Sequence, residues 1–184
     1  DLNPLMAEPD VVARYVEKAA DLNGADVVVL PGSKNTIADF SYVRSSGMAE
    51  AICRHAAQGM EVVGLCGGFQ MLGRSISDPE GVEAGGKVEG LGLLNVDTEL
   101  AGRKIVQSIE AESLEIEPAR HLPVRGYFIH MGRTTGREVR RCFRLYPRKS
   151  EIERSVCEEN GNMDGAVSDT GMIWGTYLHG VFDH

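Results

Sequence analysis

Continuous apolar runs alternate with helical periodicities over the first part of the chain. The runs at 27–30 and 61–65 are apolar at almost every position, which is typical of parallel strands buried on both faces. Helices are predicted between them, over about 36–43 and 47–58, and a third helix follows the second run to about Ser75. The order strand, helix, strand, helix predicts an α/β fold with a mostly parallel central sheet and flanking helices.

The stretch before the first run carries a weaker pattern. Residues 9–22 are predicted to form a helix, or a strand that turns into one, because four apolar positions fall on one helical face. These positions are Val12, Tyr15, Val16 and Ala19. At the start of the next helix, Asn35 or Thr36 is the expected cap.

Beyond residue 78 the pattern changes to short strands separated by glycines and charged loops, which predicts an antiparallel extension of the sheet. The expected segments are a surface loop at 78–92, strands at 92–100 and 103–110 around Gly102, an irregular stretch at 111–123, a strand at 124–130, a charged stretch at 133–160, and strands at 164–168 and 172–178. The absence of a linker or repeat predicts one domain over residues 1–184.

Composition narrows the function classes. The 184 residues suffice for one domain with a substantial core. A formal net charge of −8 argues against a nucleic-acid surface and against anionic membranes, and no apolar stretch approaches the ~20 residues that span a bilayer. The four cysteines show no Cys-x-x-Cys spacing, so neither a metal site nor a disulfide framework is expected, and a reducing, cytoplasmic setting fits.

The stretch at 61–73 carries the clearest chemical signal. An apolar run ends at Cys66, Gly67 and Gly68 follow at once, and a helical pattern then begins. This arrangement presents a nucleophile on a sharp turn between a strand and a helix, where the N-terminus of the helix favours the thiolate. Without the two glycines, a buried cysteine in a core strand would be the preferred interpretation.

A thiol nucleophile needs a base, and His179 is the best candidate. It ends an apolar strand before Gly180, so it can meet Cys66 at one edge of a parallel sheet. His130 also ends a strand before a glycine and competes for this role, and we expect it in the substrate pocket instead. His55 and His121 are expected at the surface.

Attack on an amide would create an oxyanion, which needs two N–H donors. Gly67 follows the nucleophile and can supply one of them. Gly32, in the turn after the first strand, can supply the other, although Pro31-Gly32 can also be a simple chain reversal.

Three motifs together resemble the glutamine amidotransferase domains of the cobyric acid synthase family. They are VLPGSKNT at 29–36, GLCGGFQMLG at 64–73 and WGTYLHG at 174–180, with supporting matches at 78–83, 90–94 and 126–132. The resemblance implies a flavodoxin-like class I glutaminase fold over the whole chain. It implies that Cys66 attacks the side-chain amide of glutamine and that His179 protonates the leaving ammonia. By the same resemblance Gly32 and Gly67 are oxyanion-hole donors.

The resemblance also implies a substrate pocket and partners. Gln70, His130 and Gly132 would line the glutamine pocket. No cofactor is expected in this domain. An N-terminal synthetase domain of the same protein would bind ATP and Mg and amidate carboxylates of a corrinoid, since we expect the chain, which begins at Asp1, to be a piece of a longer protein.

Two departures leave alternatives open. The wider glutaminase class has a glutamate two residues beyond the histidine, where this chain has Val181, so a Cys-His dyad is expected. The family commonly has a glutamate where Phe128 stands. The alternatives are the glutaminase domain of cobyrinic acid a,c-diamide synthase or a related amidotransferase, and a degenerate domain that only scaffolds a synthetase.

Overall fold

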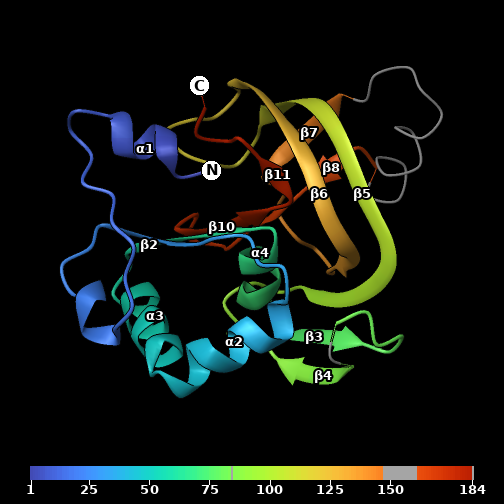
Figure 1. Ribbon diagram of the computed structural model, residues 1–184. Coiled ribbons are helices and arrows are strands. Elements are labelled where there is room, and N and C mark those ends of the chain that lie inside the picture. The colour runs from blue at the N-terminus through green and yellow to red at the C-terminus, as the bar shows by residue number, and fades with distance from the viewer. Residues whose placement is uncertain (84, 147–160, 184) are drawn as a thin grey trace.

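Four strands form a central sheet in the order β1-β2-β10-β9 (Figure 1). The structure is a computed structural model that describes residues 1–83, 85–146 and 161–183. Strands β1 (Val27–Leu30), β2 (Glu61–Leu65) and β10 (Ile173–Thr176) are parallel, and β9 (Ala166–Val167) pairs with β10 in the antiparallel sense. The predicted parallel strands at 27–30 and 61–65 are therefore confirmed. The strands predicted at 164–168 and 172–178 are each divided into two short strands, and in each case one of the two belongs to the central sheet and the other to a second sheet.

Short helices pack against this sheet. They are α2 (Thr36–Ser45), α3 (Met48–Ala57) and α4 (Gly67–Leu72). Asn35 is the cap of α2, because its side chain accepts a hydrogen bond from the N–H of Ala38 at 3.2 Å. Helix α4 ends three residues earlier than predicted, since the backbone is already extended at Gly73.

The segment before β1 differs from the prediction. Only α1 (Asn3–Ala7) and the 3-10 helix η1 (Ala19–Leu22) form there, and residues 8–18 are neither helix nor strand. The apolar periodicity was misleading because the positions on that face do not share a packing surface. Val12 is 93% exposed and Tyr15 is 71% exposed, whereas Val16 and Ala19 pack against the core.

A second, mostly antiparallel sheet stands beside the first, with strand order β11-β6-β5-β3-β4 (Figure 1). Strand β7 pairs with the far part of β5, and β8 pairs with β7. The strands are β3 (Ser75–Asp78), β4 (Gly86–Glu89), β5 (Asp97–Ser113), β6 (Pro123–Thr135), β7 (Phe143–Tyr146), β8 (Met163–Asp164) and β11 (Leu178–His179).

Two predictions for this region are wrong. The expected surface loop at 78–92 contains β4, and the expected turn at Gly102 lies within one long strand, β5. Strand β5 pairs with β6 on both sides of Gly102, and the register of this pairing changes between Glu99 and Lys104. Gly102 therefore marks an irregularity within β5. The predicted charged stretch at 133–160 lies partly outside the described residues.

The two sheets are joined where the chain passes from β10 to β11. Strand β10 pairs with β2 in the central sheet, and β11 then pairs with β6 in the second. Helix α4 contacts strands of both sheets, and its Phe69 ring meets the Tyr177 ring edge to face at 5.3 Å. The passage between sheets thus brings residue 179 to the carboxyl end of β2. None of the helices in the described part of the chain is long and apolar enough to cross a bilayer.

Candidate active site

Cys66 stands at the turn between β2 and α4 with a strained backbone. Its φ of 51° and ψ of −108° lie where residues with a Cβ are rare, and its N–H donates to the carbonyl of Thr176 at 2.8 Å. The turn lifts the Cys66 side chain out of the line of β2 at the start of α4. This is the sharp strand-to-helix turn that the sequence predicted at Cys66.

Glycines on both sides of Cys66 make this turn possible. A Cβ on Gly68 would lie 2.0 Å from the carbonyl oxygen of Leu30, and a Cβ on Gly64 would lie 2.7 Å from the backbone nitrogen of Phe69. The part played by Gly64 was missed in the sequence, although the Gly-x-Cys-x-Gly spacing around the nucleophile is a signal for it. The glycines let β1, β2 and α4 meet at one point.

The Cys66 thiol is half-buried and donates to the carbonyl of Ile129 in β6 at 3.3 Å. At two other cysteines, burial disfavours the thiolate. Burial raises the pKa of the Cys53 thiol, and burial raises that of Cys142 still further. Within the described residues no group of three or more His, Cys, Asp or Glu side chains could hold a metal ion.

His179 lies in β11 with its ring held on several sides. Its Nδ1 is 2.7 Å from Oδ2 of Asp1, and the Tyr127 ring stacks on it with centroids 5.2 Å apart and an interplanar angle of 7°. Its Nε2 is buried and has no hydrogen-bond partner among the described residues. Because Nδ1 is engaged by a carboxylate, Nε2 is the nitrogen left to exchange a proton with a nucleophile or substrate.

Cys66, His179 and Gly32 meet at one place. An ideal Cβ on Gly32 would lie 3.4 Å from Cε1 of His179 and 3.7 Å from Cβ of Cys66. The turn after β1 therefore passes beside both side chains, and the absence of a side chain there leaves room between them. The structure thus brings the predicted nucleophile and the predicted base together beside the glycine turn.

The two predicted oxyanion donors also lie here. Gly67 is the first residue of α4, so its N–H has no acceptor within the helix. Gly67 packs on the 32–33 turn, since a Cβ at Gly67 would lie 2.9 Å from the backbone nitrogen of Ser33. Among the backbone hydrogen bonds of the described residues, neither Gly32 nor Gly67 donates its N–H. Both N–H groups are therefore available to a ligand.

The three residues predicted to line the glutamine pocket lie in α4 and β6. Gln70 is 2% exposed, and its amide N–H groups donate to the Met131 carbonyl and the Tyr177 hydroxyl, each at 3.1 Å. Gly132 has a φ of 106°, and a Cβ there would lie 2.7 Å from the carbonyl of Glu99, so it permits the close approach of β5 to β6. His130 lies in β6, and its side chain is outside the described part of the structure.

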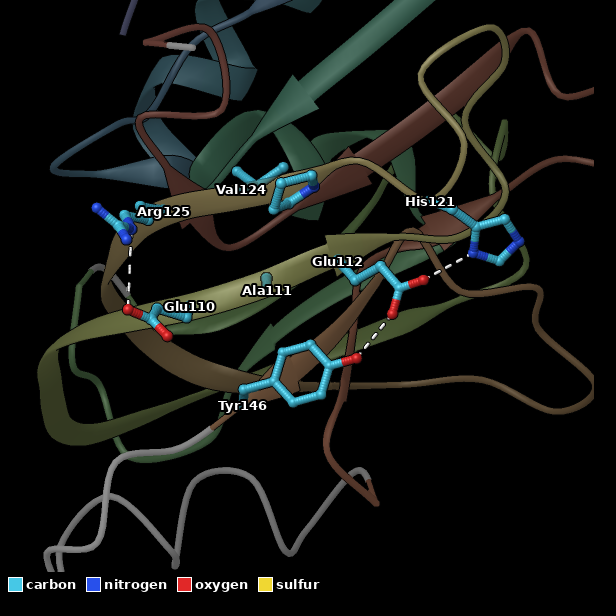
Figure 2. A pocket seen from close by; sticks show the side chains of 8 residues that line it. Glu110, Ala111, Glu112, His121, Val124, Arg125 and Tyr146 are labelled. Carbon is cyan, nitrogen blue, oxygen red and sulfur yellow. Dashed lines mark hydrogen bonds and ion pairs between the residues drawn. The ribbon is translucent and has the colours of Figure 1, made fainter.

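Two further histidines, His55 and His121, are not part of this cluster. His55 is buried, not at the surface as predicted, because α3 turns it inward and its Nε2 lies 3.2 Å from the Glu61 carbonyl. His121 is exposed as predicted and lies 2.7 Å from Glu112. It lines a hollow of about 340 Å³ with Arg125 and Tyr146, which contains none of the predicted site residues (Figure 2).

Asp1 was missed as a site residue. The sequence offers no signal for it, because it lies 178 positions from His179 and in no motif. With Asp1, the cluster consists of a thiol on a strained turn, an imidazole anchored by a carboxylate, and two backbone N–H groups. Such a set can carry out acyl transfer through a covalent thioester.

Comparisons with solved structures agree with this architecture. A structure described as a glutamine amidotransferase matches 97% of this chain and 82% of its own, with a TM-score of 0.65 and 19% identity. PurLQS from Thermotoga maritima matches 97% of this chain and 79% of its own, with a TM-score of 0.59 and 18% identity. At these identities the likeness concerns the α/β fold.

Sequence relatives are closer. Cobyric acid synthase of Ruegeria sp. (strain TM1040) is 47% identical over 99% of this chain and 35% of its own length. Cobyric acid synthase of Rhizobium meliloti (strain 1021) is 44% identical over 99% of this chain and 34% of its own. The chain thus spans about a third of the length of these relatives.

A family model agrees with these relatives over the whole chain. The model of the CobB/CobQ-like glutamine amidotransferase domain matches residues 1–184, which include both the Cys66 turn and the His179 strand. The chain belongs to the family of CobB/CobQ-like glutamine amidotransferase domains.

Proposed function

We propose that this domain hydrolyses glutamine through a Cys66 thioester and supplies ammonia for the amidation of corrinoid carboxylates in a cobyric acid synthase. The observation that carries the proposal is the meeting of Cys66, His179 and the Gly32 turn at the carboxyl ends of β1 and β2. The relatives named cobyric acid synthase supply the biosynthetic context.

The first half of the reaction forms a thioester. The sulfur of Cys66 attacks the side-chain amide carbon of glutamine, and the carbonyl electrons move onto oxygen. The N–H groups of Gly32 and Gly67 stabilise that oxyanion. His179, which has taken the proton of the thiol, gives it to the amide nitrogen, and the C–N bond breaks to release ammonia.

The second half restores the enzyme. Nε2 of His179 takes a proton from water as the water oxygen attacks the thioester carbon, and the same two N–H groups stabilise the second oxyanion. The C–S bond then breaks, the sulfur recovers a proton from His179, and glutamate leaves. Burial of Nε2 suits this exchange, because bulk water does not compete for its lone pair.

The glutamine pocket remains a prediction for three residues. Gln70 lies on α4, one helical turn after Cys66. Both of its N–H groups already donate to protein acceptors, the Met131 carbonyl and the Tyr177 hydroxyl. Gln70 would therefore contribute to glutamine binding through these two neighbours, or by exchanging one of these hydrogen bonds for one to glutamine. His130 and Gly132 follow Ile129, whose carbonyl accepts from the Cys66 thiol. This places the backbone of β6 beside the thiol.

The partner is proposed to be a synthetase domain that precedes this one in the same protein. The relatives are about three times as long as the chain, which leaves room for it. That domain would bind ATP, Mg and the corrinoid, and this one would be a flavodoxin-like class I glutaminase without a cofactor. The family of biosynthetic relatives fits a cytoplasmic enzyme, as does the absence of a disulfide among the described cysteines.

Phe128 bears on the alternative of a degenerate scaffold. Strand β6 pairs Tyr127 with His179 and Phe128 with Leu178, so Phe128 faces away from the histidine, and both Phe128 and Leu178 are buried in the core. A side chain on that face does not touch the His179 ring. The glutamine-hydrolysing function is therefore favoured over a scaffold.

The test is Cys66→Ala, with Cys53→Ala as the matched control. We expect Cys66→Ala to lower glutamine hydrolysis by at least about 10³-fold, since the covalent route is lost, and Cys53→Ala to leave it unchanged. Ammonia release from glutamine measures both. A glutamine-analogue electrophile should label Cys66, as read by peptide mass. Labelling of Cys53 with Cys66 intact would contradict the proposal.

A further inference from the structure

The Asp1 carboxylate bridges two groups at the end of β11. Its Oδ2 lies 2.7 Å from Nδ1 of His179, and its Oδ1 accepts from the N–H of Gly180 at 3.0 Å. The two side chains are largely shielded from water, with 12% of His179 and 16% of Asp1 exposed. Figure 1 shows the N-terminus of the chain beside β11.

We propose that Asp1 is the positioning acid of the site and completes a Cys66–His179–Asp1 triad. The proposal rests on the proposed function, in which His179 is the base. It assigns the orienting role to a segment far from the histidine in sequence. The position two residues beyond His179, where other glutaminases were expected to carry the acid, is Val181, which packs against the hydrophobic core.

The two hydrogen bonds define what Asp1 does. The carboxylate accepts from Nδ1–H, which selects the tautomer in which Nε2 carries no proton. The bond from Gly180 fixes the second oxygen, so the carboxylate cannot swing away from the ring. Tyr127, stacked on the ring face, limits rotation about the remaining axis. Asp1 acts through His179 and does not touch the thiol.

Asp183 is the other acid near this point. One of its carboxylate oxygens would lie 3.0 Å from a Cβ on Gly180, yet its side chain makes no hydrogen bond to His179 in the described structure. It therefore serves as a neighbouring acid that should not replace Asp1. Asp10 is an exposed acid of the same N-terminal segment and serves as a surface control.

The experiment compares Asp1→Ala, Asp1→Asn and Asp1→Glu in the full chain, with the same residues ahead of position 1 in every variant. For glutamine hydrolysis we expect Asp1→Ala and Asp1→Asn to lower kcat by about 10- to 100-fold, less than for a serine nucleophile because a thiol needs less help from its base. We expect KM to change by less than about 3-fold, since Asp1 does not contact glutamine. Asp1→Glu should recover much of the lost kcat.

Three results would overturn the proposal. One is an unchanged kcat in Asp1→Ala. Another is a loss that Asp1→Glu does not relieve and that accompanies a fall in melting temperature, because it would mark a purely structural anchor. The third is a loss of kcat in Asp183→Asn with none in Asp1→Asn, which would move the role to Asp183. The control Asp10→Asn should have the kcat of the unaltered chain. Ammonia release that persists in Cys66→Ala would instead contradict the proposed function, whatever the result for Asp1.

Discussion

Glycines fix how closely the segments around Cys66 approach one another. Gly68 lies against the carbonyl of Leu30 and Gly64 against the start of α4, so β1, β2 and α4 are closer than any side chain would permit. This closeness puts the first turn of α4, with its free N–H of Gly67, beside the thiol. At the residue scale, therefore, the position of the Cys66 sulfur depends on the lack of a side chain at Gly64 and Gly68.

Gly68→Ala should damage both stability and chemistry. The added Cβ would lie 2.0 Å from the Leu30 carbonyl oxygen, so α4 must shift, at an expected cost of about 1–3 kcal/mol in unfolding free energy. Misplacement of Cys66 should lower glutamine hydrolysis at least about 10-fold. Urea unfolding and an ammonia assay measure the two effects.

Gly102→Ala is the matched control, because the nearest atom to its Cβ would be 3.8 Å away. It should change the unfolding free energy by less than about 0.5 kcal/mol. Equal effects of the two substitutions would contradict the steric explanation.

At the same scale, the site residues predicted from the sequence are those that a local pattern marks. Cys66 and Gly67 stand in one strand-to-helix turn, and the glycine after an apolar run marks Gly32. Asp1 could not be predicted, since only the folded chain brings it to His179. His55 was misjudged because a helix position does not reveal which neighbour will accept its ring nitrogen.

At the scale of elements, a buried chain of polar side chains joins two helices to the second sheet. Thr36 donates to Gln70, Gln70 donates to Tyr177, and the Tyr177 hydroxyl lies 2.5 Å from that of Thr134 in β6, which in turn lies 2.7 Å from Thr98 in β5. Burial raises the pKa of the Tyr177 hydroxyl, which therefore stays protonated. The network fixes α2 and α4 relative to the second sheet.

Tyr177→Phe should test this connection. Removal of the hydroxyl leaves the Thr134 hydroxyl and one N–H of Gln70 short of a partner in a buried site, at an expected cost of about 1–3 kcal/mol. The urea midpoint measures it. Tyr42→Phe, at a ring that is 58% exposed, is the matched control and should shift the unfolding free energy by less than about 0.5 kcal/mol. A Tyr177→Phe variant as stable as the unaltered chain would show the network to be dispensable.

Elements were predictable where the apolar run was continuous. Strands β1 and β2 are continuous apolar runs, and they were placed to the residue. The predictions failed where contacts with distant parts of the chain decide the local structure. Residues 9–22 have helical spacing but no surface that takes up the whole face, and Gly102 reads as a turn although β6 pairs with β5 on both sides of it. Pairing between distant strands leaves little mark on local sequence.

At the scale of the whole molecule, one acid is buried where the two sheets join. Asp164 accepts from the hydroxyl of Thr176 and, at 3.1 Å, from the N–H of Tyr177, so it holds the passage from β10 to β11. Burial raises the pKa of Asp164 above its ordinary 3.8, although these hydrogen bonds oppose the rise. The folded protein therefore binds this proton more tightly than the unfolded chain does.

The sign of this linkage gives a prediction for pH. The contribution of Asp164 to stability is full below pH 3.8 and is lost as the pH rises through the raised folded value. Relative to Asp164→Asn, which cannot titrate, the unaltered chain should thus lose unfolding free energy as the pH increases above 3.8. Urea unfolding of both proteins over a pH series measures the difference.

The contributions of other acids to the pH dependence of stability cancel in the difference between the two proteins. The pKa of Asp97, for example, is lowered by the hydroxyl of Ser75 and by Arg74, and it acts equally in both proteins. Asp10→Asn, at an exposed acid, provides a matched control whose stability difference should not vary with pH. A difference between Asp164→Asn and the unaltered chain that is flat over the same range would contradict the assignment.

The order of strands in the central sheet has a consequence for how the protein is made. Strand β2, which ends beside Cys66, lies between β1 and β10, and Val62 pairs with Ile173. During synthesis on the ribosome, β2 therefore lacks one of its two neighbours until residues 173–176 emerge, and the proposed base follows only with residue 179. Pairing over such a separation is slow to form, so we infer that the surroundings of the Cys66 thiol form late in folding, after most of the chain around it has been made.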